Sequence, residues 1–152
     1  MQGDKLIIDL QGLLLGIDTC VIAGIVEMES IPFLPGQKGF VSGIISLRGE
    51  PVAVAGLSAA FEASSPVAGR APHKVIIARQ SGRTLGLDAD GGVLSFLWNE
   101  EIKSGRKTAK KENSFRYVEE VVETARGDVS IIDWRLIFED TARILSTHGA
   151  GI

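Results

Sequence analysis

The sequence GLLLGID at residues 12–18 returns 70 positions later as GRTLGLD at residues 82–88, with Gly, Leu, Gly and Asp at the matching positions. Ile7 falls on Ile77 at the same offset. In the first copy, apolar residues flank Gln11-Gly12 on both sides, which is the pattern of a β-hairpin closed by a tight turn. A repeat at a fixed offset indicates that the chain contains two structural units of one design.

A second repeat lies further along each half. RGE at residues 48–50 is followed by an apolar run and by Phe61, and RGD at residues 126–128 is followed by an apolar run and by Phe138. The offset between these two motifs is 78, whereas it is 70 for the first repeat, so the second half has gained eight residues. We expect the additional residues in the charged stretch 99–114.

Both halves consist of short apolar segments closed by glycine-bearing turns, which predicts an all-β fold. Two prolines predict a loop at residues 31–36, and a stretch rich in Ala, Ser, Pro and Gly predicts a linker at residues 62–72. Two units of about five short strands each are accommodated by two small barrels packed together, because closure hides the strand edges. The further elements expected are strands at residues 21–28, 41–47 and 52–55, a tight turn at 48–51 and a helical turn at 59–61.

The C-terminal segment departs from this pattern and predicts a helix of about three turns. Asp133 stands where a helix N-cap is expected, and Gly149 lies beyond the expected end of the helix. The residues between them that follow helical spacing are Trp134, Ile137, Phe138, Thr141 and Leu145.

The chain has 152 residues, of which 45% are hydrophobic and 23% charged, and this is enough for one domain with a core of its own. A formal net charge of −3 disfavours nucleic acid as a partner. The richest apolar stretch, residues 6–26, is interrupted by acidic side chains, whereas a membrane-spanning helix needs about 20 predominantly apolar residues. The N-terminal sequence MQGDKLIIDL does not resemble a signal peptide. We therefore expect a cytoplasmic protein that does not insert directly into the membrane.

Side chains that carry chemistry are sparse. His73 and His148 are the two histidines and are predicted to lie at the surface, while Cys20, in an apolar run, is predicted to be a small buried residue. GFVSG at residues 39–43 lacks the spacing of a nucleophile elbow. LDADGG at residues 87–92 lacks later ligands of a calcium loop and is better explained as a hairpin turn. The sequence thus predicts no catalytic, metal or cofactor site, and an enzyme is the least favoured class.

Two features leave a structural and a binding interpretation open, with the structural one favoured. Trp98 and Trp134 suit core packing, and they would also serve as anchors in an interface. A cluster of basic side chains suits a solvated loop, and it would also contact an acidic partner. The cluster comprises Lys103, Arg106, Lys107, Lys110 and Lys111.

Residues 40–52, FVSGIISLRGEPV, closely resemble the segment around the G-x-x-N-L-R-G hairpin of the bacterial chemotaxis coupling protein family CheW. Further similar motifs follow in the order of that family between about residues 5 and 145. They are GID at residues 16–18, LP at 34–35, LGL at 85–87, GGV at 91–93 and the segment 126–133 that begins with RGD.

The resemblance implies a single CheW-like domain over residues 1–152. The implied fold class is all-β, with two SH3-like five-stranded β-barrel subdomains packed together and a C-terminal helix. The first barrel would cover about residues 13–68, and the second barrel with the helix about residues 72–150. Whether the N-terminal strand crosses between the barrels is left open.

The resemblance also implies a non-catalytic adaptor without cofactor or metal. Members of the family couple the cytoplasmic tips of chemoreceptors to the regulatory domain of the histidine kinase CheA, a domain of the same fold. The protein would then be cytoplasmic and associated with membrane-bound receptor arrays. By family position, the partner-binding residues would lie at one hairpin, whose tight backbone its glycines permit, and on one neighbouring strand. They are Ile22, Ile25, Gly43, Leu47, Arg48 and Gly49.

The sequence departs from the family pattern at three places. Ala23-Gly24 stand where a charged or amide residue is common, Ser46 replaces the asparagine before Leu-Arg-Gly, and Gly56 replaces an aspartate before the helical turn. The change at Gly24 removes a polar partner contact, and the change at Gly56 removes an N-cap contribution of up to about 1 kcal/mol. Two alternatives follow: a module that competes for or inhibits the kinase coupling site, and a coupling protein of a pilus-type or other noncanonical chemosensory system.

Overall fold

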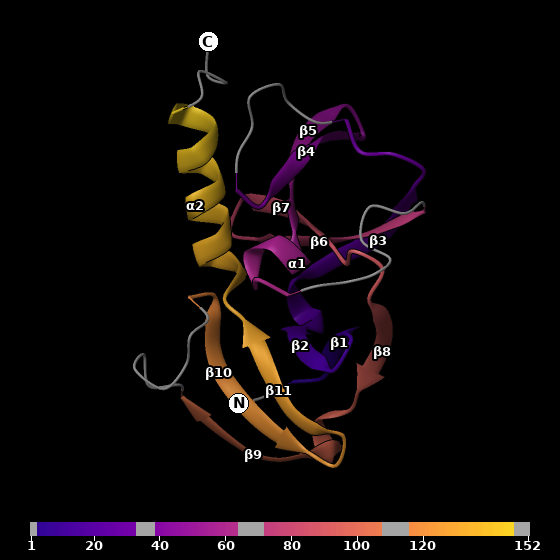
Figure 1. Cartoon of the computed structure of the whole chain (residues 1–152), viewed down its shortest axis with the longest axis vertical. Coiled ribbons are helices and arrows are strands. Elements are labelled where there is room, and N and C mark those ends of the chain that lie inside the picture. Colours follow the sequence, from indigo (N-terminus) through magenta and orange to yellow (C-terminus); the bar gives the residue numbers. More distant parts are fainter. Residues whose placement is uncertain (1–2, 33–38, 64–71, 108–115, 148–152) are drawn as a thin grey trace.

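The computed structural model describes residues 3–32, 39–63, 72–107 and 116–147, which form two β-sheets and a C-terminal helix (Figure 1). The strands are β1 (Lys5–Leu10), β2 (Leu13–Asp18), β3 (Ile22–Met28), β4 (Val41–Leu47), β5 (Glu50–Gly56), β6 (His73–Gln80), β7 (Arg83–Asp88), β8 (Val93–Leu97), β9 (Ile102–Lys107), β10 (Val118–Thr124) and β11 (Gly127–Ile132). The helices are α1 (Leu57–Ala60) and α2 (Trp134–Thr147), with short 3-10 turns at Thr19–Val21 and Asn99–Glu101.

Sheet A has the strand order β8-β1-β2-β11-β10-β9, and sheet B has the order β3-β6-β7-β5-β4. The predicted fold class, an all-β arrangement of two β-barrel subdomains with a C-terminal helix, is confirmed. The subdomains differ in strand number, because β9 adds a sixth strand to sheet A. This strand lies in the charged stretch 99–114, where the two repeat offsets place the additional residues of the second half.

The two sheets exchange hairpins between the halves of the sequence. Strands β1 and β2 lie in sheet A between β8 and β11, while β6 and β7 lie in sheet B between β3 and β5. The expected barrel boundaries, 13–68 and 72–150, therefore do not coincide with the sheets, because each sheet contains strands from both halves. Strand β1 belongs to the first half of the sequence but pairs with β8 of the second half. The N-terminal strand therefore does cross into the other subdomain.

The second glycine of each GxxxG repeat lies where the exchanged hairpin meets its neighbouring strand. Gly16 and Gly86 lie at the parallel contacts β2–β11 and β7–β5. A Cβ atom on Gly16 would lie 2.9 Å from Cγ1 of Val129, and one on Gly86 would lie 2.9 Å from Cγ1 of Val75. The repeat thus keeps a glycine where each exchanged hairpin packs closely against its neighbours.

The hairpin between β4 and β5 turns on two residues, Arg48 and Gly49, whose φ angles are 53° and 80°. Left-handed backbone at both positions is typical of a type I′ turn, which suits the twist of a hairpin. The turn is shorter than the expected range 48–51, because Pro51 lies within β5 opposite Ser46. Strand β7 pairs with β5 only from Val54 onward, so the start of β5 is a sheet edge on the side of β7. Proline is tolerated at this edge because no neighbouring strand needs a backbone N–H donor from it.

The second hairpin, between β10 and β11, is displaced by one residue from the sequence match. Leu47 pairs with Glu50 across the first turn, and Thr124 pairs with Gly127 across the second, which gives a spacing of 77 instead of 78. Helices α1 and α2 also begin 77 residues apart, at positions 57 and 134. The RGE and RGD motifs therefore match in sequence but are offset by one residue relative to their turns. Arg48 is the first residue of its turn, whereas Arg126 is the second residue of its turn.

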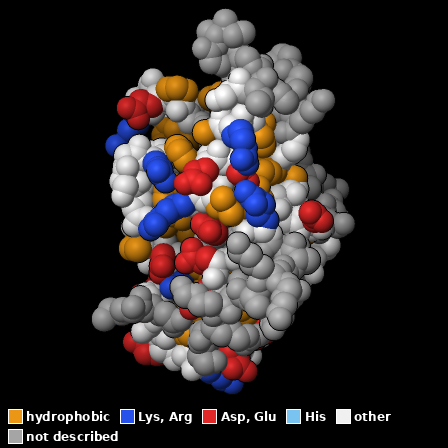
Figure 2. All heavy atoms as spheres, turned by 90° about the vertical axis from the view of Figure 1, so that its left-hand side faces the viewer, with side chains coloured by type: hydrophobic (Ala, Val, Ile, Leu, Met, Phe, Trp, Pro, Cys, Tyr) orange, Lys and Arg blue, Asp and Glu red, His pale blue; other side chains and the backbone are white. Residues whose placement is uncertain are grey.

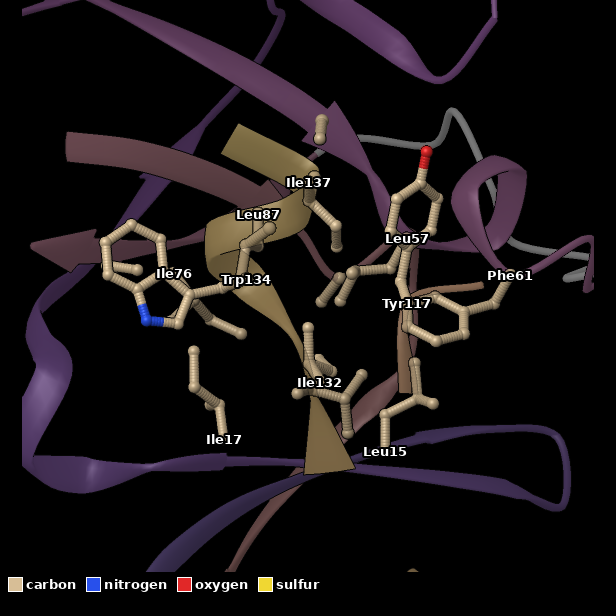
Figure 3. Packing of buried hydrophobic residues seen from close by; sticks show 14 of the residues in the cluster. Leu15, Ile17, Leu57, Phe61, Ile76, Leu87, Tyr117, Ile132, Trp134 and Ile137 are labelled. Atoms are coloured by element: carbon tan, nitrogen blue, oxygen red, sulfur yellow. The ribbon is translucent and has the colours of Figure 1, made fainter. Parts of the chain in front are cut away.

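The main hydrophobic core lies where the two sheets and α2 meet (Figure 3). Ile132 contributes from sheet A, Ile76 and Leu87 contribute from sheet B, and Trp134 and Ile137 contribute from α2. Trp134 is buried, which confirms core packing for this tryptophan. One shared core makes the two subdomains a single packing unit.

Helix α2 begins as predicted at the Asp133 N-cap, whose Oδ1 atom accepts a hydrogen bond from the backbone N–H of Leu136 at 3.3 Å. The helix has 14 residues, about four turns, and is one turn longer than expected. The surface on the α2 side carries basic and acidic side chains interspersed with apolar groups (Figure 2).

The predictions for Cys20, His73 and Trp98 are wrong. Cys20 is exposed in the turn before β3, because the residue of that turn that enters the core is Val21. His73 is not a surface residue of a linker, since it begins β6 and its ring is largely buried against Asp88. Trp98 is 57% exposed and does not pack in the core.

The basic cluster is partly a strand instead of a loop, since residues 103, 106 and 107 belong to β9. LDADGG at residues 87–92 is not a hairpin turn, because β7 and β8 lie in different sheets. Lys110, Lys111, His148 and most of the expected loop 31–36 and linker 62–72 lie outside the described residues. No helix in the described ranges is long and apolar enough to cross a membrane.

Candidate partner-binding surface

Strand β3, the β4–β5 turn and strand β6 enclose a hollow of about 170 Å³. We call it the Arg48 hollow. Three of the six residues assigned by family position line it, namely Ile25, Leu47 and Arg48. The full lining comprises Ala23, Gly24, Ile25, Val26, Leu47, Arg48, Ile77 and Arg79.

Strand β3 gives the hollow an exposed apolar wall. It forms one edge of sheet B, and its residues alternate between half-buried and exposed. Ile25 is 45% exposed, while Ile22, at the start of the strand, is half-buried and does not line the hollow. A large exposed apolar side chain on an open strand edge is a common element of protein interfaces.

Arg48 is presented by the left-handed turn at the end of β4. Its side chain is exposed and forms no ion pair or hydrogen bond with another residue in the described ranges. Gly49 follows with a φ of 80°, as the expected tight hairpin requires. Gly43 does not shape the turn, because it is buried inside β4 beside a register shift between β4 and β5. An unpaired arginine beside apolar groups is a typical interface residue.

Ile77 and Arg79 complete the hollow from β6, and sequence reasoning missed both. The Nε–H of Arg79 donates a hydrogen bond to Oγ1 of Thr84 at 3.2 Å, which ties this side chain to β7. The two residues join the hollow only because β6 pairs with β3, where Ile76 lies opposite Ile25. No local sequence pattern reports that pairing.

Strand β8 carries an exposed aromatic patch at the equivalent place in sheet A. On β3, Ile25 pairs with Ile76, and on β8, Phe96 pairs with Leu6. Leu6 and Ile76 are counterparts at the repeat offset of 70, so Ile25 and Phe96 occupy equivalent positions. Phe96 is 37% exposed, and its ring meets that of exposed Trp98 edge to face, with the centroids 4.5 Å apart. Each sheet therefore presents an apolar side chain at the same position of an edge strand.

The arginine of the second hairpin, Arg126, is engaged at this aromatic patch. Its Nη2 donates hydrogen bonds to the backbone oxygen of Phe96 at 2.6 Å and to Oε1 of Glu101 at 3.1 Å. Its Nη1 donates to Oγ of Ser95 at 3.0 Å. Arg126 thus braces β8 within the protein, whereas Arg48 is left available at the surface.

Residues 4–142 of this sequence match the family model of the CheW-like domain. The chain belongs to the CheW-like domain family. Its structure is similar to the crystal structure of the scaffolding protein TtCheW from Thermoanaerobacter tengcongensis, with a TM-score of 0.69 and 23% sequence identity over 87% of this chain and 89% of that chain. The structural likeness shows a shared fold. No curated protein matches the sequence.

The two glycines at which we expect departures from the family pattern differ in their surroundings. A Cβ atom on Gly24 would meet no atom within 4 Å, so the missing side chain leaves open space at the hollow. A Cβ atom on Gly56 would lie 3.0 Å from Oγ of Ser42 and 3.2 Å from Oδ2 of Asp90. Position 56 is therefore occupied by its neighbours, and position 24 is not.

Asp90 supplies the N-cap acceptor that Gly56 lacks. Its Oδ2 atom accepts hydrogen bonds from the backbone N–H and from the hydroxyl of Ser58, each at 2.9 Å. Asp90 is 9% exposed, and this burial raises the pKa of its carboxyl, while the hydrogen bond from the Ser58 N–H opposes the rise. A residue on the crossover between the two sheets thus caps α1 of this CheW-like domain.

Two further side chains extend this polar contact. The backbone N–H of Asp90 donates to Oδ1 of Asp88 at 3.0 Å, and Nδ1 of His73 lies 3.0 Å from Oδ2 of Asp88. We call Ser58, His73, Asp88 and Asp90 the carboxylate cluster. It joins α1, β6 and the β7–β8 crossover. Across the ranges that the structure describes, no three His, Cys, Asp or Glu side chains are arranged to hold a metal ion.

A second polar contact fixes α2 of the CheW-like domain to the segment before β10. The hydroxyl of Tyr117 donates to Oδ2 of Asp140 at 2.6 Å, and Arg116 and Arg143 form ion pairs with the same carboxylate. Burial, together with Asp140, raises the pKa of Tyr117 to about 12. Burial acts to raise the pKa of Asp140, but hydrogen bonds from Arg116 and Tyr117 outweigh it and lower that pKa.

Proposed function

We propose that this protein is a non-catalytic adaptor that couples chemoreceptors to a CheA-type histidine kinase in bacterial chemotaxis. The observation that carries the proposal is that Ile25, Leu47 and Arg48 meet in one surface hollow of a CheW-like domain. The structurally similar TtCheW is a scaffolding protein, which supports the same class of function.

The adaptor acts by contact. One subdomain docks on the regulatory domain of the kinase, to which the family resemblance assigns the same fold. The seam between the subdomains receives an amphipathic helix of the receptor tip, as apolar grooves do in other complexes. Edge strands β3 and β8 present apolar side chains on different sheets, which allows two partners to bind together. The adaptor works in the cytoplasm, beside membrane-bound receptor arrays.

A second candidate function is favoured by the open position at Gly24. A module that lacks a polar contact there would occupy the kinase coupling site without engaging a receptor, and it would compete with or inhibit coupling. A pilus-type or other noncanonical chemosensory system is a further setting for the coupling function.

Isothermal titration of the purified protein against a kinase regulatory domain and a receptor cytoplasmic tip from the same organism tests the coupling. We expect Arg48→Ala to weaken binding of at least one partner by about tenfold or more, because interface arginines are frequent hot spots. Arg135→Ala is the matched control, since Arg135 is exposed on α2 and donates a hydrogen bond to Gln80, away from the hollow.

Receptor-stimulated kinase activity separates the two candidates. An adaptor raises this activity when added to receptor and kinase, whereas a competing module lowers it. If the wild-type protein binds neither domain, the coupling proposal is wrong.

A further inference from the structure

Among the residues that the structure describes, the lining of the Arg48 hollow includes basic side chains and no acidic one. Two of its lining residues are arginines, Arg48 and Arg79, and none is Asp or Glu. Neither guanidinium forms an ion pair with a residue in the described part of the chain. Because both arginines line the hollow, an anion that enters it is attracted by two positive charges.

The size of the hollow indicates what kind of group enters it. Its volume of about 170 Å³ is below the range of roughly 300–1,000 Å³ typical of small-molecule sites, and an edge strand forms one wall. Both features favour a single side chain of a protein partner. Gly24 makes the room, because no atom lies within 4 Å of the place where its Cβ would be.

We propose that the Arg48 hollow receives an Asp or Glu side chain of a protein partner, with its carboxylate between Arg48 and Arg79. An aliphatic side chain that neighbours this acid in the partner packs on Ile25 and Leu47. The inference deepens the proposed coupling function and rests on it, since it states the chemistry that the partner presents at this site.

The charge pattern gives this contact its specificity. Hydrogen bonds between a guanidinium and a carboxylate are stronger than neutral ones, and the planar guanidinium can hold both carboxylate oxygens. A partner with Gln or Lys at the same place would leave the two arginines without a counter-charge. Gly24 and Arg79 are therefore specificity-determining positions, in addition to Arg48.

Binding of the kinase regulatory domain and of the receptor tip is to be measured for Arg79→Ala, Gly24→Glu and Arg135→Ala. We expect Arg79→Ala to weaken one partner at least fivefold. Gly24→Glu places a carboxylate of the protein's own in the hollow, and we expect it to weaken the same partner at least tenfold. Arg135→Ala is the control and should bind like the wild type, because Arg135 is exposed on α2, donates a hydrogen bond to Gln80 and does not line the hollow.

A charge exchange identifies the acid. In the affected partner, each surface Asp or Glu is changed to Lys, and binding is measured to the wild type and to Arg79→Glu. One such Lys variant should bind Arg79→Glu at least fivefold more tightly than it binds the wild type. Thermal unfolding of the Gly24 and Arg79 variants near that of the wild type shows that the fold is intact.

The outcomes are distinguishable. If the wild type binds a partner and Arg79→Ala and Gly24→Glu bind it equally well, the inference is overturned while the coupling function stands. The same conclusion follows if affinity is weakened but no partner acid responds to charge exchange. If the wild type binds neither partner, the coupling function fails first, and this inference fails with it.

Discussion

Replacement of Asp90 provides the sharpest test of how the crossover between the sheets is held. Oδ2 of Asp90 accepts two hydrogen bonds from Ser58, and Gly56 offers no side chain in its place. Asp90→Ala leaves two donors of Ser58 without this acceptor, and each buried donor left unsatisfied costs about 1–3 kcal/mol. Because Ser58 is half-buried and water reaches it in part, we expect a total loss of about 2 kcal/mol in the free energy of unfolding.

Asp90→Asn separates the hydrogen bonds from the charge. The amide oxygen keeps an acceptor for Ser58, so we expect this variant to be close to the wild type at neutral pH or more stable. Burial raises the pKa of Asp90 in the folded state, which means that the folded protein holds the proton more tightly than the unfolded chain does. The protonated Asp90 carboxyl therefore adds to the free energy of unfolding at pH values below the pKa that it has in the unfolded chain. This contribution is lost as the pH rises through the higher pKa that it has in the folded protein.

The wild type should therefore lose stability relative to Asp90→Asn as the pH rises from about 4 toward neutrality. Two titratable groups of the described ranges that act on Asp90 are Asp88 from β7 and His73 from β6, and both are retained in the comparison. Urea unfolding of the wild type, Asp90→Asn and Asp90→Ala at several pH values measures the effect. In thermal unfolding, Asp90→Ala should lower Tm by about 4–8 °C. Equal losses for Asn and Ala, or a constant difference between wild type and Asp90→Asn, would refute this reasoning.

Two more predictions follow from close packing and from the tyrosine contact. Gly86→Ala should destabilise the fold by about 1–3 kcal/mol, since its Cβ would lie 2.9 Å from Cγ1 of Val75, whereas Gly24→Ala should leave the urea midpoint unchanged. Tyr117 is the single tyrosine, so absorbance at alkaline pH reports it alone, and its midpoint should be about 12 in the folded protein and near 10 in urea. The stability that comes from the raised pKa of Tyr117 is present below the pKa of the unfolded chain and is lost as the pH rises through about 12. A midpoint near 10 in the folded protein would contradict the contact with Asp140.

The elements were largely predictable from the sequence because each is decided by neighbours in the chain. The apolar alternation around Gln11-Gly12 predicts the β1–β2 hairpin, and Asp133 followed by helical spacing predicts α2. The hairpin exchange was not predicted, since a repeat shows which segments are equivalent and says nothing about which strand pairs with which. Burial of single residues failed for the same reason: Cys20 lies in an apolar run, yet the turn directs Val21 inward.

The candidate site was predictable only in part. The turn residues Leu47 and Arg48 belong to a recognisable motif, and Ile25 follows from family position. Arg79 carries no signal of its own, because it reaches the hollow through the pairing of β3 with β6. Asp90 escaped notice as a helix cap because a cap is sought next to its helix, and this one comes from 32 residues further along the chain.

The hairpin exchange also bears on the history and the assembly of the molecule. Each half lends two strands to the other and borrows two in return, so neither half closes its own sheet. Two copies of a half-length chain would satisfy the same pairings as an intertwined dimer, and fusion of the two copies would yield the present chain. Fragments cut between β5 and β6 should consequently complement one another when mixed, while each alone remains incompletely folded.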